Sequence, residues 1–410
     1  MLFRSDNAKV IGSLLKVKSS NYLEIRNKLK INLKNIKVMD VFTAPFFSYE
    51  IIDLLEILRL AHYLSIKYDV MITNPPYLGL KSLEDIPKKY LTNNYPDSKS
   101  DMFAMFMETE FVKENGYIAM INMHSWMFIS SYQKLRRNVI ENNMLVSMLH
   151  LGARAFEEIG GDVVQTVTFT LRQFRIKSYI STVYKLDDLN TAEKKEKGFL
   201  NKTGVLFLDI YKLKPMPGSQ LSYWVSDKIL DVFAKSTPIE KYIDSFQGII
   251  TGNNEKFLRF WHEVKIENVS LAKGNMNEID LSRSYWIPYN KGGAFRKWYG
   301  NQDYVVNWKN GSKDKTRGKQ SFESYYLKEY VSWSYIASNT LATRFYPKGF
   351  LWDVAGSGIF DKSNTLFYLQ GFIGSKVGIA ILKALNPTIN YQVENILQLP
   401  IIYSIENKEM

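Results

Sequence analysis

A short apolar run, residues 68–73, leads directly into the tetrapeptide Asn-Pro-Pro-Tyr at residues 74–77. A run of this kind, bounded by turn residues, predicts a short buried strand. The two prolines stiffen the loop after the run and remove two backbone N–H donors, so the strand cannot continue through them. The chain therefore has to place a rigid loop, with polar and aromatic side chains, at the carboxyl end of a strand.

Strand and helix patterns alternate after this loop. Further strands are expected at residues 117–122, 144–151 and 162–172. One helix is expected from Ser100 to the Asn115-Gly116 pair, with apolar residues up to Phe111 and Val112 at helical spacing, and another over residues 130–143. This order is typical of an α/β domain with a mostly parallel sheet.

The character of the chain changes in its second half. Residues 191–204 are charged and lack apolar periodicity, and we expect residues 191–235 to form a charged loop or linker. Farther on, aromatic residues become frequent and helical periodicity returns at residues 371–386. The sequence thus predicts an α/β domain over residues 1–190 and a second, α+β domain over residues 236–410.

Composition narrows the classes of partner and chemistry. The 53 basic and 41 acidic residues give a net charge of +12, which favours a polyanionic partner, DNA or RNA before others. The chain has no cysteine, which excludes disulfides, thiolate metal sites and a cysteine nucleophile. Its four histidines show no ligand spacing, so no metal site is expected. No signal peptide or membrane helix is recognisable, and a cytoplasmic protein is expected.

The rigid loop has the chemistry to hold an amino group on a planar base. In open α/β sheets, ligands bind at the carboxyl ends of strands. The Asn74 side-chain oxygen and the Pro75 carbonyl can accept both hydrogens of an adenine amino group, which moves its nitrogen towards a reactive, tetrahedral form. Tyr77 offers a face for stacking, and the base has to leave the duplex at a cost of a few kcal/mol. The alternative is that the tetrapeptide is only a rigid turn.

The motif and several other segments resemble one family. Asn74-Pro75-Pro76-Tyr77 is similar to the catalytic motif of amino-group DNA methyltransferases that use S-adenosylmethionine. The segments that extend this similarity are residues 95–128, 149–172, 246–264, 286–300 and 385–401. In this order they resemble the PglX-type adenine-specific DNA methyltransferases of bacteriophage-exclusion (BREX) systems, which are phage-defence relatives of restriction-modification enzymes.

The resemblance implies roles for individual residues. Asn74 and Pro75 would hold the adenine amino group, Pro76 would complete the motif, and Tyr77 would stack on the ring. Phe156 would place a second aromatic against the flipped base, the alternative being an ordinary core phenylalanine. Asp6 would belong to the adenosine pocket of the cofactor, and Asp101 would lie in a segment that helps shape the cofactor side of the pocket. The first domain would then be part of a Rossmann-like methyltransferase domain, and the second a DNA target-recognition domain.

One feature of such enzymes is missing ahead of the motif. The family carries a glycine-rich cofactor loop there, because backbone must approach S-adenosylmethionine closely. Before residue 74 this chain has a single glycine, Gly12, so we expect an amino-terminally truncated enzyme whose first half lies elsewhere. A permuted arrangement, with residues 352–360 ("WDVAGSGIF") as the cofactor loop, is the alternative, but no strand-to-helix pattern surrounds that segment.

The second domain has the composition of a DNA reader. Between Arg283 and Lys348 there are 12 basic and 4 acidic residues, with aromatic residues interleaved. Basic residues neutralise phosphates without reading sequence. The expected DNA-binding residues are Lys291, Arg296, Lys297, Lys313, Lys315, Arg317 and Lys319. For the glycine-containing loop at residues 309–319, the alternative is a solvated charged loop.

Three functions remain open from the sequence. The first is a DNA adenine-N6 methyltransferase that acts on double-stranded DNA, together with an amino-terminal half or other phage-exclusion proteins. The second is a non-catalytic DNA-binding remnant, or one half of a split enzyme. The third is RNA or protein methylation through the same tetrapeptide, against which the basic second domain and the PglX-like segments argue.

Overall fold

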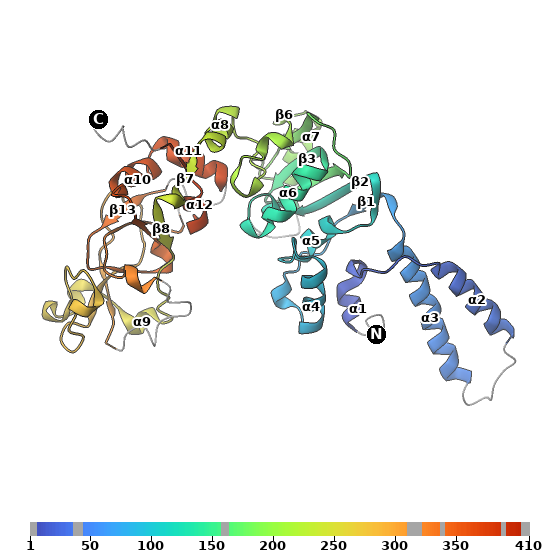
Figure 1. Cartoon of the computed structure of the whole chain (residues 1–410), viewed down its shortest axis with the longest axis horizontal. Helices are drawn as coiled ribbons and strands as arrows, with labels where there is room; N and C mark the ends of the chain where they lie inside the picture. Colours follow the sequence, from blue (N-terminus) through green and yellow to red (C-terminus); the bar gives the residue numbers. More distant parts are fainter. Residues whose placement is uncertain are drawn as a thin grey trace. The chain divides into compact units, whose positions relative to one another are not determined.

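The computed structural model describes residues 6–35, 44–156, 164–309, 322–336, 341–386 and 391–402. The chain divides into two compact units, Met1–Tyr223 and Trp224–Met410 (Figure 1). The alternating strand and helix pattern of the sequence falls in the first unit, and the aromatic-rich half forms the second.

The first unit is built on a six-stranded sheet with the order β1-β2-β4-β3-β5-β6. Its strands are β1 (Tyr68–Thr73), β2 (Val112–Met123), β3 (Met144–Gly152), β4 (Thr166–Arg172), β5 (Ser181–Lys185) and β6 (Val205–Leu208). β1 pairs with β2 in parallel and β3 with β5 in parallel, whereas β4 lies antiparallel between β2 and β3. Strands β1, β2, β3 and β5 therefore point the same way, which confirms the predicted α/β class with a parallel-rich sheet.

Seven α-helices belong to the described part of this unit. They are α1 (Asp6–Ile11), α2 (Tyr22–Asn35), α3 (Ala44–Ser65), α4 (Asp85–Asn94), α5 (Met102–Met105), α6 (Gln133–Asn142) and α7 (Ala192–Leu200). α6 fills most of the helix predicted over residues 130–143 and buries Leu135, Val139 and Ile140. α2 and α3 lie side by side (Figure 1), and the Arg26 Nε donates to the Leu55 carbonyl at 3.1 Å.

The helix predicted from Ser100 to the Asn115-Gly116 pair is wrong beyond its first turns. α5 and a short 3₁₀ turn end at Glu108, and β2 begins at Val112. Asn115 and Gly116 lie inside β2, where Asn115 has φ 66° and a Cβ on Gly116 would lie 2.7 Å from the Asp69 carbonyl oxygen. The pair forms an irregularity in the strand beside β1 instead of a helix end. An Asn-Gly pair is compatible with a strand irregularity as well as with a helix end, so the sequence did not distinguish the two.

The linker expected at residues 191–235 is also wrong. Thr191 caps α7 by accepting from the Lys194 N–H, and β6 continues the sheet beyond β5. The segment ends with α8 (Asp227–Lys235). Its charged residues lie mostly on the exposed side of α7, while Lys195 and Gly198 are buried. The prediction failed because a short helix with so many charged residues has a composition that is also typical of a loop.

β1 is an edge strand among the described strands. Successive side chains of a strand point to opposite faces, so Tyr68, Val70 and Ile72 share one face. They are 37%, 52% and 79% exposed, respectively. The strand that leads into Asn-Pro-Pro-Tyr thus has both an unpaired backbone edge and an uncovered apolar face.

The second unit contains two four-stranded sheets, of order β14-β10-β11-β9 and β13-β12-β15-β8, and a two-stranded ladder of β16 and β7. Its strands are β7 (Thr237–Pro238), β8 (Ile243–Phe246), β9 (Leu258–Phe260), β10 (Trp286–Asn290), β11 (Tyr304–Asn307), β12 (Tyr330–Trp333), β13 (Thr343–Tyr346), β14 (Leu351–Trp352), β15 (Gly358–Asp361) and β16 (Pro400–Ile401). Its other helices are α9 (Asn254–Phe257), α10 (Leu366–Ile373), α11 (Lys376–Leu385) and α12 (Val393–Leu397). The core between the two larger sheets is aromatic, with Tyr289, Tyr330 and Trp352 fully buried.

Residues 352–360 form a buried turn between two strands. β14 is followed by a 3₁₀ turn, Val354–Gly356, and then by β15. A Cβ on Gly356 would lie 2.6 Å from the Asn290 Oδ1, so this glycine allows close packing in the core. Because no helix follows β14, the segment does not have the strand-to-helix context of a cofactor loop.

Within the described residues, no single helix is long and apolar enough to cross a membrane. α10 and α11 reach that length and composition only when they are taken together, and they bend by 71° between them.

Candidate active site

Asn74 to Tyr77 leave the sheet at the carboxyl end of β1. The parallel pairing of Thr73 with Met120 fixes this end of β1 beside β2. Asn74 is exposed, Pro75 is buried and Tyr77 is half-buried. The loop therefore leaves Asn74 exposed, while buried Pro75 anchors the loop.

The ring of Tyr77 is held from both ends. Its hydroxyl donates to the Ile121 carbonyl of β2 at 3.2 Å, and the ring meets buried Phe103 edge-on, with centroids 5.9 Å apart. Burial raises the pKa of the Tyr77 hydroxyl. These contacts fix the orientation of the ring before any ligand binds, as stacking on a planar base requires.

Asp101 ties the exit of the loop to α5. Its Oδ1 accepts from the Leu78 N–H at 2.9 Å and from the Phe103 N–H at 3.2 Å, and the Met102 N–H donates to the Leu78 carbonyl at 3.1 Å. Burial raises the pKa of Asp101, and these backbone hydrogen bonds oppose that rise. By binding the backbone N–H groups of Leu78 and Phe103, the carboxylate fixes the backbone next to Tyr77 and at Phe103. The sequence did not predict this role.

Phe156 follows β3 and lies on the same edge of the sheet. β2 and β3 are both antiparallel to β4, so the carboxyl ends of β1, β2 and β3 share one edge. Phe156 is half-buried, four residues after the end of β3 at Gly152, and residues 157–163 lie outside the described residues. Asp6 begins α1, and its side chain lies outside the description.

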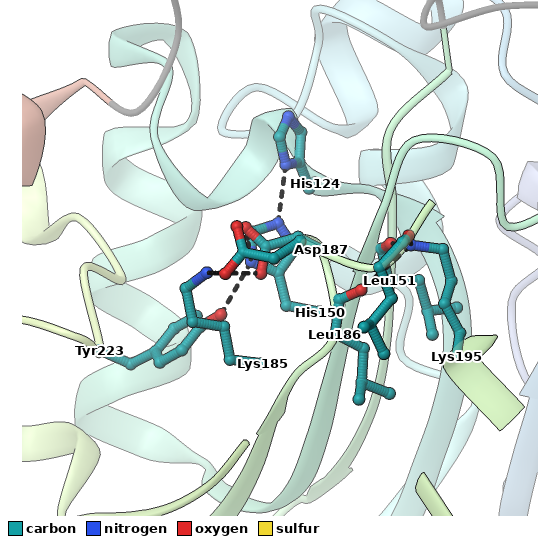
Figure 2. A network of polar contacts seen from close by, with 10 residues as sticks. His124, His150, Leu151, Lys185, Leu186, Asp187, Lys195 and Tyr223 are labelled. Atoms are coloured by element: carbon teal, nitrogen blue, oxygen red, sulfur yellow. Dashed lines mark hydrogen bonds and ion pairs between the residues drawn. The ribbon is translucent and has the colours of Figure 1, made fainter. Parts of the chain in front are cut away.

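A buried polar network lies at this edge, and the sequence did not predict it (Figure 2). His124 directly follows β2, and its Nδ1 lies 2.9 Å from the Nε2 of His150 on β3. The Nδ1 of His150 lies 2.8 Å from the Tyr223 hydroxyl and 3.9 Å from a carboxylate oxygen of Asp187. The Asp187 carboxylate also pairs with Lys185 at 3.1 Å. The only sequence signal was that His124 closely follows one predicted strand and His150 lies near the end of another.

Both histidines are held in the neutral form. Burial, and then the neighbouring His150, lower the pKa of His124 to about 3. Burial lowers the pKa of His150 to about 4, although the Asp187 carboxylate opposes this shift. A neutral imidazole has one N–H and one lone pair. The contact between the rings therefore joins a donor to an acceptor, as a hydrogen bond requires.

Lys195 extends the network to the loop that carries Phe156. Its Nζ donates to the carbonyls of Leu151 at 2.6 Å and Leu186 at 3.0 Å (Figure 2). It also donates to the carbonyl of Leu189. Leu151 is next to Gly152, where β3 ends. At the other end of this segment, the backbone N–H of His124 donates to the carbonyl of Gln165 at 2.8 Å, just ahead of β4. The network thus holds both ends of the 153–165 segment.

The predicted DNA-binding residues divide into three groups. Lys291 forms an ion pair with buried Asp353 at 2.6 Å, and the Lys297 Nζ donates to the Gly374 carbonyl at 2.9 Å. Arg296 is exposed. The remaining predicted residues, Lys313, Lys315, Arg317 and Lys319, lie outside the described residues. Among the residues that can be described, no group of three or more His, Asp or Glu side chains could hold a metal ion.

Comparisons with known proteins identify relatives of this chain. Residues 3–156 match the family model of the Eco57I restriction-modification methylase. The chain is 36% identical to the adenine-specific methyltransferase PglX of Lacticaseibacillus casei (strain Zhang), over 98% of this chain and 35% of that protein. It is 32% identical to the adenine-specific methyltransferase BrxX of Escherichia coli O9:H4 (strain HS), over 97% of this chain and 32% of that protein.

A solved structure shows the same fold. The Type IIL restriction-modification enzyme MmeI, in complex with DNA, superposes with a TM-score of 0.51 at 13% sequence identity, over 84% of this chain and 48% of that chain. The resemblance drawn from the sequence motifs is thus confirmed, and the chain is a relative of the adenine-specific methyltransferases PglX and BrxX that spans about a third of their length.

Proposed function

We propose that this chain holds the target adenine and binds the DNA in an adenine-N6 DNA methyltransferase of phage defence. The observation that carries the proposal is that exposed Asn74 and the oriented ring of Tyr77 belong to one rigid loop at the carboxyl edge of the sheet. The names of the relatives support adenine as the base. Such an enzyme would act on double-stranded DNA in the cytoplasm.

Each residue of the motif has a distinct role in this proposal. The Asn74 side-chain oxygen and the Pro75 carbonyl accept the two N6 hydrogens, and Pro76 keeps the loop rigid. Tyr77 stacks on one face of the extruded base, and Phe156 covers the other. The two acceptors draw the amino nitrogen out of conjugation with the ring and hold it more strongly as it gains positive charge.

The described residues do not by themselves fit S-adenosylmethionine. The single glycine ahead of the motif, Gly12, has φ 56° but no atoms within 4 Å of an added Cβ, so it forms no close cradle. We infer that the methyl donor binds mainly to polypeptide outside these residues. Asp6 and Asp101 would contribute at most the margin of that pocket.

The uncovered side of β1 supports a covering polypeptide. A donor within reach of Asn74 has to lie at the carboxyl edge of the sheet, and among the described strands β1 has a free edge there. The exposed Val70 and Ile72 would pack against that polypeptide. It could be joined to this chain or be the other half of a split enzyme.

The chain alone is therefore expected to bind S-adenosylmethionine weakly or not at all. Isothermal titration with the purified chain measures this directly. A dissociation constant in the low micromolar range would contradict the inference that the donor pocket lies mainly elsewhere.

DNA binding is expected to depend steeply on salt. Each phosphate contact contributes roughly −0.9 to the slope of log affinity against log salt. The variant Arg296→Gln should make the slope shallower by about that amount. Lys194→Gln, which removes an exposed charge from α7 in the first unit, is the matched control and should leave the slope unchanged. Equal slopes for the parent and Arg296→Gln would place the phosphate contacts elsewhere.

Activity separates the enzyme from a non-catalytic DNA-binding remnant. The chain is combined with the part of the L. casei relative that lies outside the matched region, and tritiated S-adenosylmethionine and unmethylated genomic DNA are supplied. Label recovered as N6-methyladenine supports the methyltransferase. DNA binding without any label, when the relative alone in its full length is active, supports the remnant.

A further inference from the structure

The connection between β10 and β11 is a long hairpin loop that exposes aromatic side chains. We define the aromatic loop as residues 291–303, which join these two antiparallel strands. Phe295, Trp298 and Tyr299 are 59%, 48% and 60% exposed, respectively. Around its tip, residues 293–296 are all exposed. Large apolar side chains gathered on one loop usually mark a binding site.

The aromatic loop is clamped along its length, so the exposed side chains do not result from a loose segment. The Trp298 N–H donates to the Thr343 carbonyl at 2.9 Å, and the Phe345 N–H donates to the Trp298 carbonyl at 2.8 Å. The Asn301 side chain donates to the Ala294 carbonyl at 2.9 Å, across the base of the tip. A rigid loop loses little conformational entropy when it binds.

The turn between α10 and α11 holds the same loop from the other side. The Gln370 Nε2 donates to the Trp298 carbonyl at 3.0 Å, and the Lys297 Nζ donates to the Gly374 carbonyl at 2.9 Å. A Cβ on Gly374 would lie 3.0 Å from the Trp298 indole, so the indole packs directly on this glycine. Trp298 also has φ 75°, a strained conformation for an aromatic residue. Such strain persists where the surroundings enforce it, and it is found often at ligand sites.

The charge of the aromatic loop fits a polyanion. Its charged residues are Lys291, Arg296, Lys297 and Asp303. Lys291 is paired with Asp353, whereas Arg296 is exposed immediately after Phe295. The tip thus combines an aromatic ring with an adjacent guanidinium. Base stacks flanked by phosphates offer partners for both groups.

We propose that Phe295 is a wedge that inserts between stacked base pairs of duplex DNA, while Arg296 contacts the adjacent phosphate. The inference rests on the proposed DNA binding and adds to it a side chain that deforms the duplex. Apolar wedges of this kind partly unstack a base step and kink the helix.

The test exploits the cost of unstacking. A base step at a mismatch is cheaper to open than a paired one. The parent chain should therefore bind a duplex with a central mismatch more tightly than the fully paired duplex of the same sequence, as measured by fluorescence anisotropy. Phe295→Ala should lose this preference and bind either duplex about tenfold or more weakly, because stacking on an aromatic ring contributes that much per base.

Three variants serve as controls. Arg296→Gln should keep the mismatch preference but show a shallower salt dependence, since it removes a phosphate contact. Phe295→Trp should keep both affinity and preference, because the face of the ring does the stacking. Phe207→Ala removes a phenylalanine that is 73% exposed on β6 in the first unit, and it should bind like the parent. Thermal unfolding should be the same for all four variants, since each side chain is exposed.

The outcomes are distinct. Binding of Phe295→Ala like the parent to both duplexes would overturn the proposal and point to a different macromolecule for the aromatic loop. If Phe295→Ala binds more weakly but the parent shows no preference for the mismatched duplex, Phe295 contacts the surface of the DNA and the proposed insertion is wrong. Failure of the parent to bind any duplex would reject DNA as the partner of the whole chain, and the wedge with it.

Discussion

Asn74→Ala is expected to lower the rate of adenine methylation about 10²–10³-fold in an enzyme that has its cofactor-binding part. The amide oxygen of Asn74 is a fixed acceptor for an amino nitrogen that becomes positive during methyl transfer. Its interaction is therefore stronger in the transition state than in the ground state, and its loss reduces kcat more than binding. Single-turnover transfer of tritiated methyl groups to DNA measures the effect.

DNA affinity should change little in the same variant, because phosphate contacts dominate binding. Asn201→Ala, at the exposed end of α7, is the matched control and should react like the parent. Tyr77→Ala should also slow transfer. Tyr77→Phe should be tolerated, since it keeps the stacking face and loses only the hydrogen bond to the Ile121 carbonyl. Parent-like rates for Asn74→Ala would mean that the motif is only a turn.

His150→Ala is expected to lower the free energy of unfolding by about 2–4 kcal/mol. The His150 ring is buried between the His124 ring and the Tyr223 hydroxyl, and both hydrogen bonds are lost with it. The truncation also leaves a cavity next to the end of β3. Urea denaturation at pH 7.5 measures the change. His262→Ala, which removes an exposed ring in the second unit, should stay within about 0.5 kcal/mol of the parent.

Acid should destabilise the first unit through the same two rings. Their folded pKa values, about 3 for His124 and about 4 for His150, lie below the usual value of 6.5. Below about pH 6.5 the unfolded chain therefore takes up protons that the folded chain does not, and the free energy of unfolding falls as the pH is lowered. The expected loss is up to about 2 kcal/mol for each histidine between pH 6.5 and 5.

The double variant His124→Gln, His150→Gln isolates this contribution. Its stability should change less than that of the parent between pH 7.5 and 5, because neither glutamine titrates. Equal pH dependence in the two proteins would show that at least one ring is already protonated in the folded chain. The Asp187 carboxylate, 3.9 Å from the His150 Nδ1, would then be the group that stabilises the charge.

Local sequence patterns predicted the elements that depend on local forces. The strand before Asn74 and the helix at α6 follow from apolar runs and turn residues. The predicted helix after Ser100 was wrong because Phe111 and Val112 have helical spacing, yet the chain gains more by pairing Val112 with Tyr68 of β1. Tertiary pairing overrode propensity there, as it often does for strands.

The supporting parts of the site depend on contacts between residues far apart in the chain. Asn74 and Tyr77 could be proposed from the sequence because their chemistry lies within four consecutive residues. The bond from Leu78 to Asp101, and the chain of contacts from His124 through His150 to Tyr223, join residues whose spacing has no period. Such contacts exist only once the sheet has formed, so no local pattern could have indicated them.

The uncovered edge of β1 has a consequence for the behaviour of the chain in solution. Its N–H and C=O groups have no strand partner within the described part of the chain and lie beside an apolar face that includes Val70 and Ile72. They are a template on which another copy of the same strand can pair. We expect self-association that grows with protein concentration and is suppressed by a lysine at position 72. Light scattering of the parent and of Ile72→Lys would show whether solubility is limited at this strand.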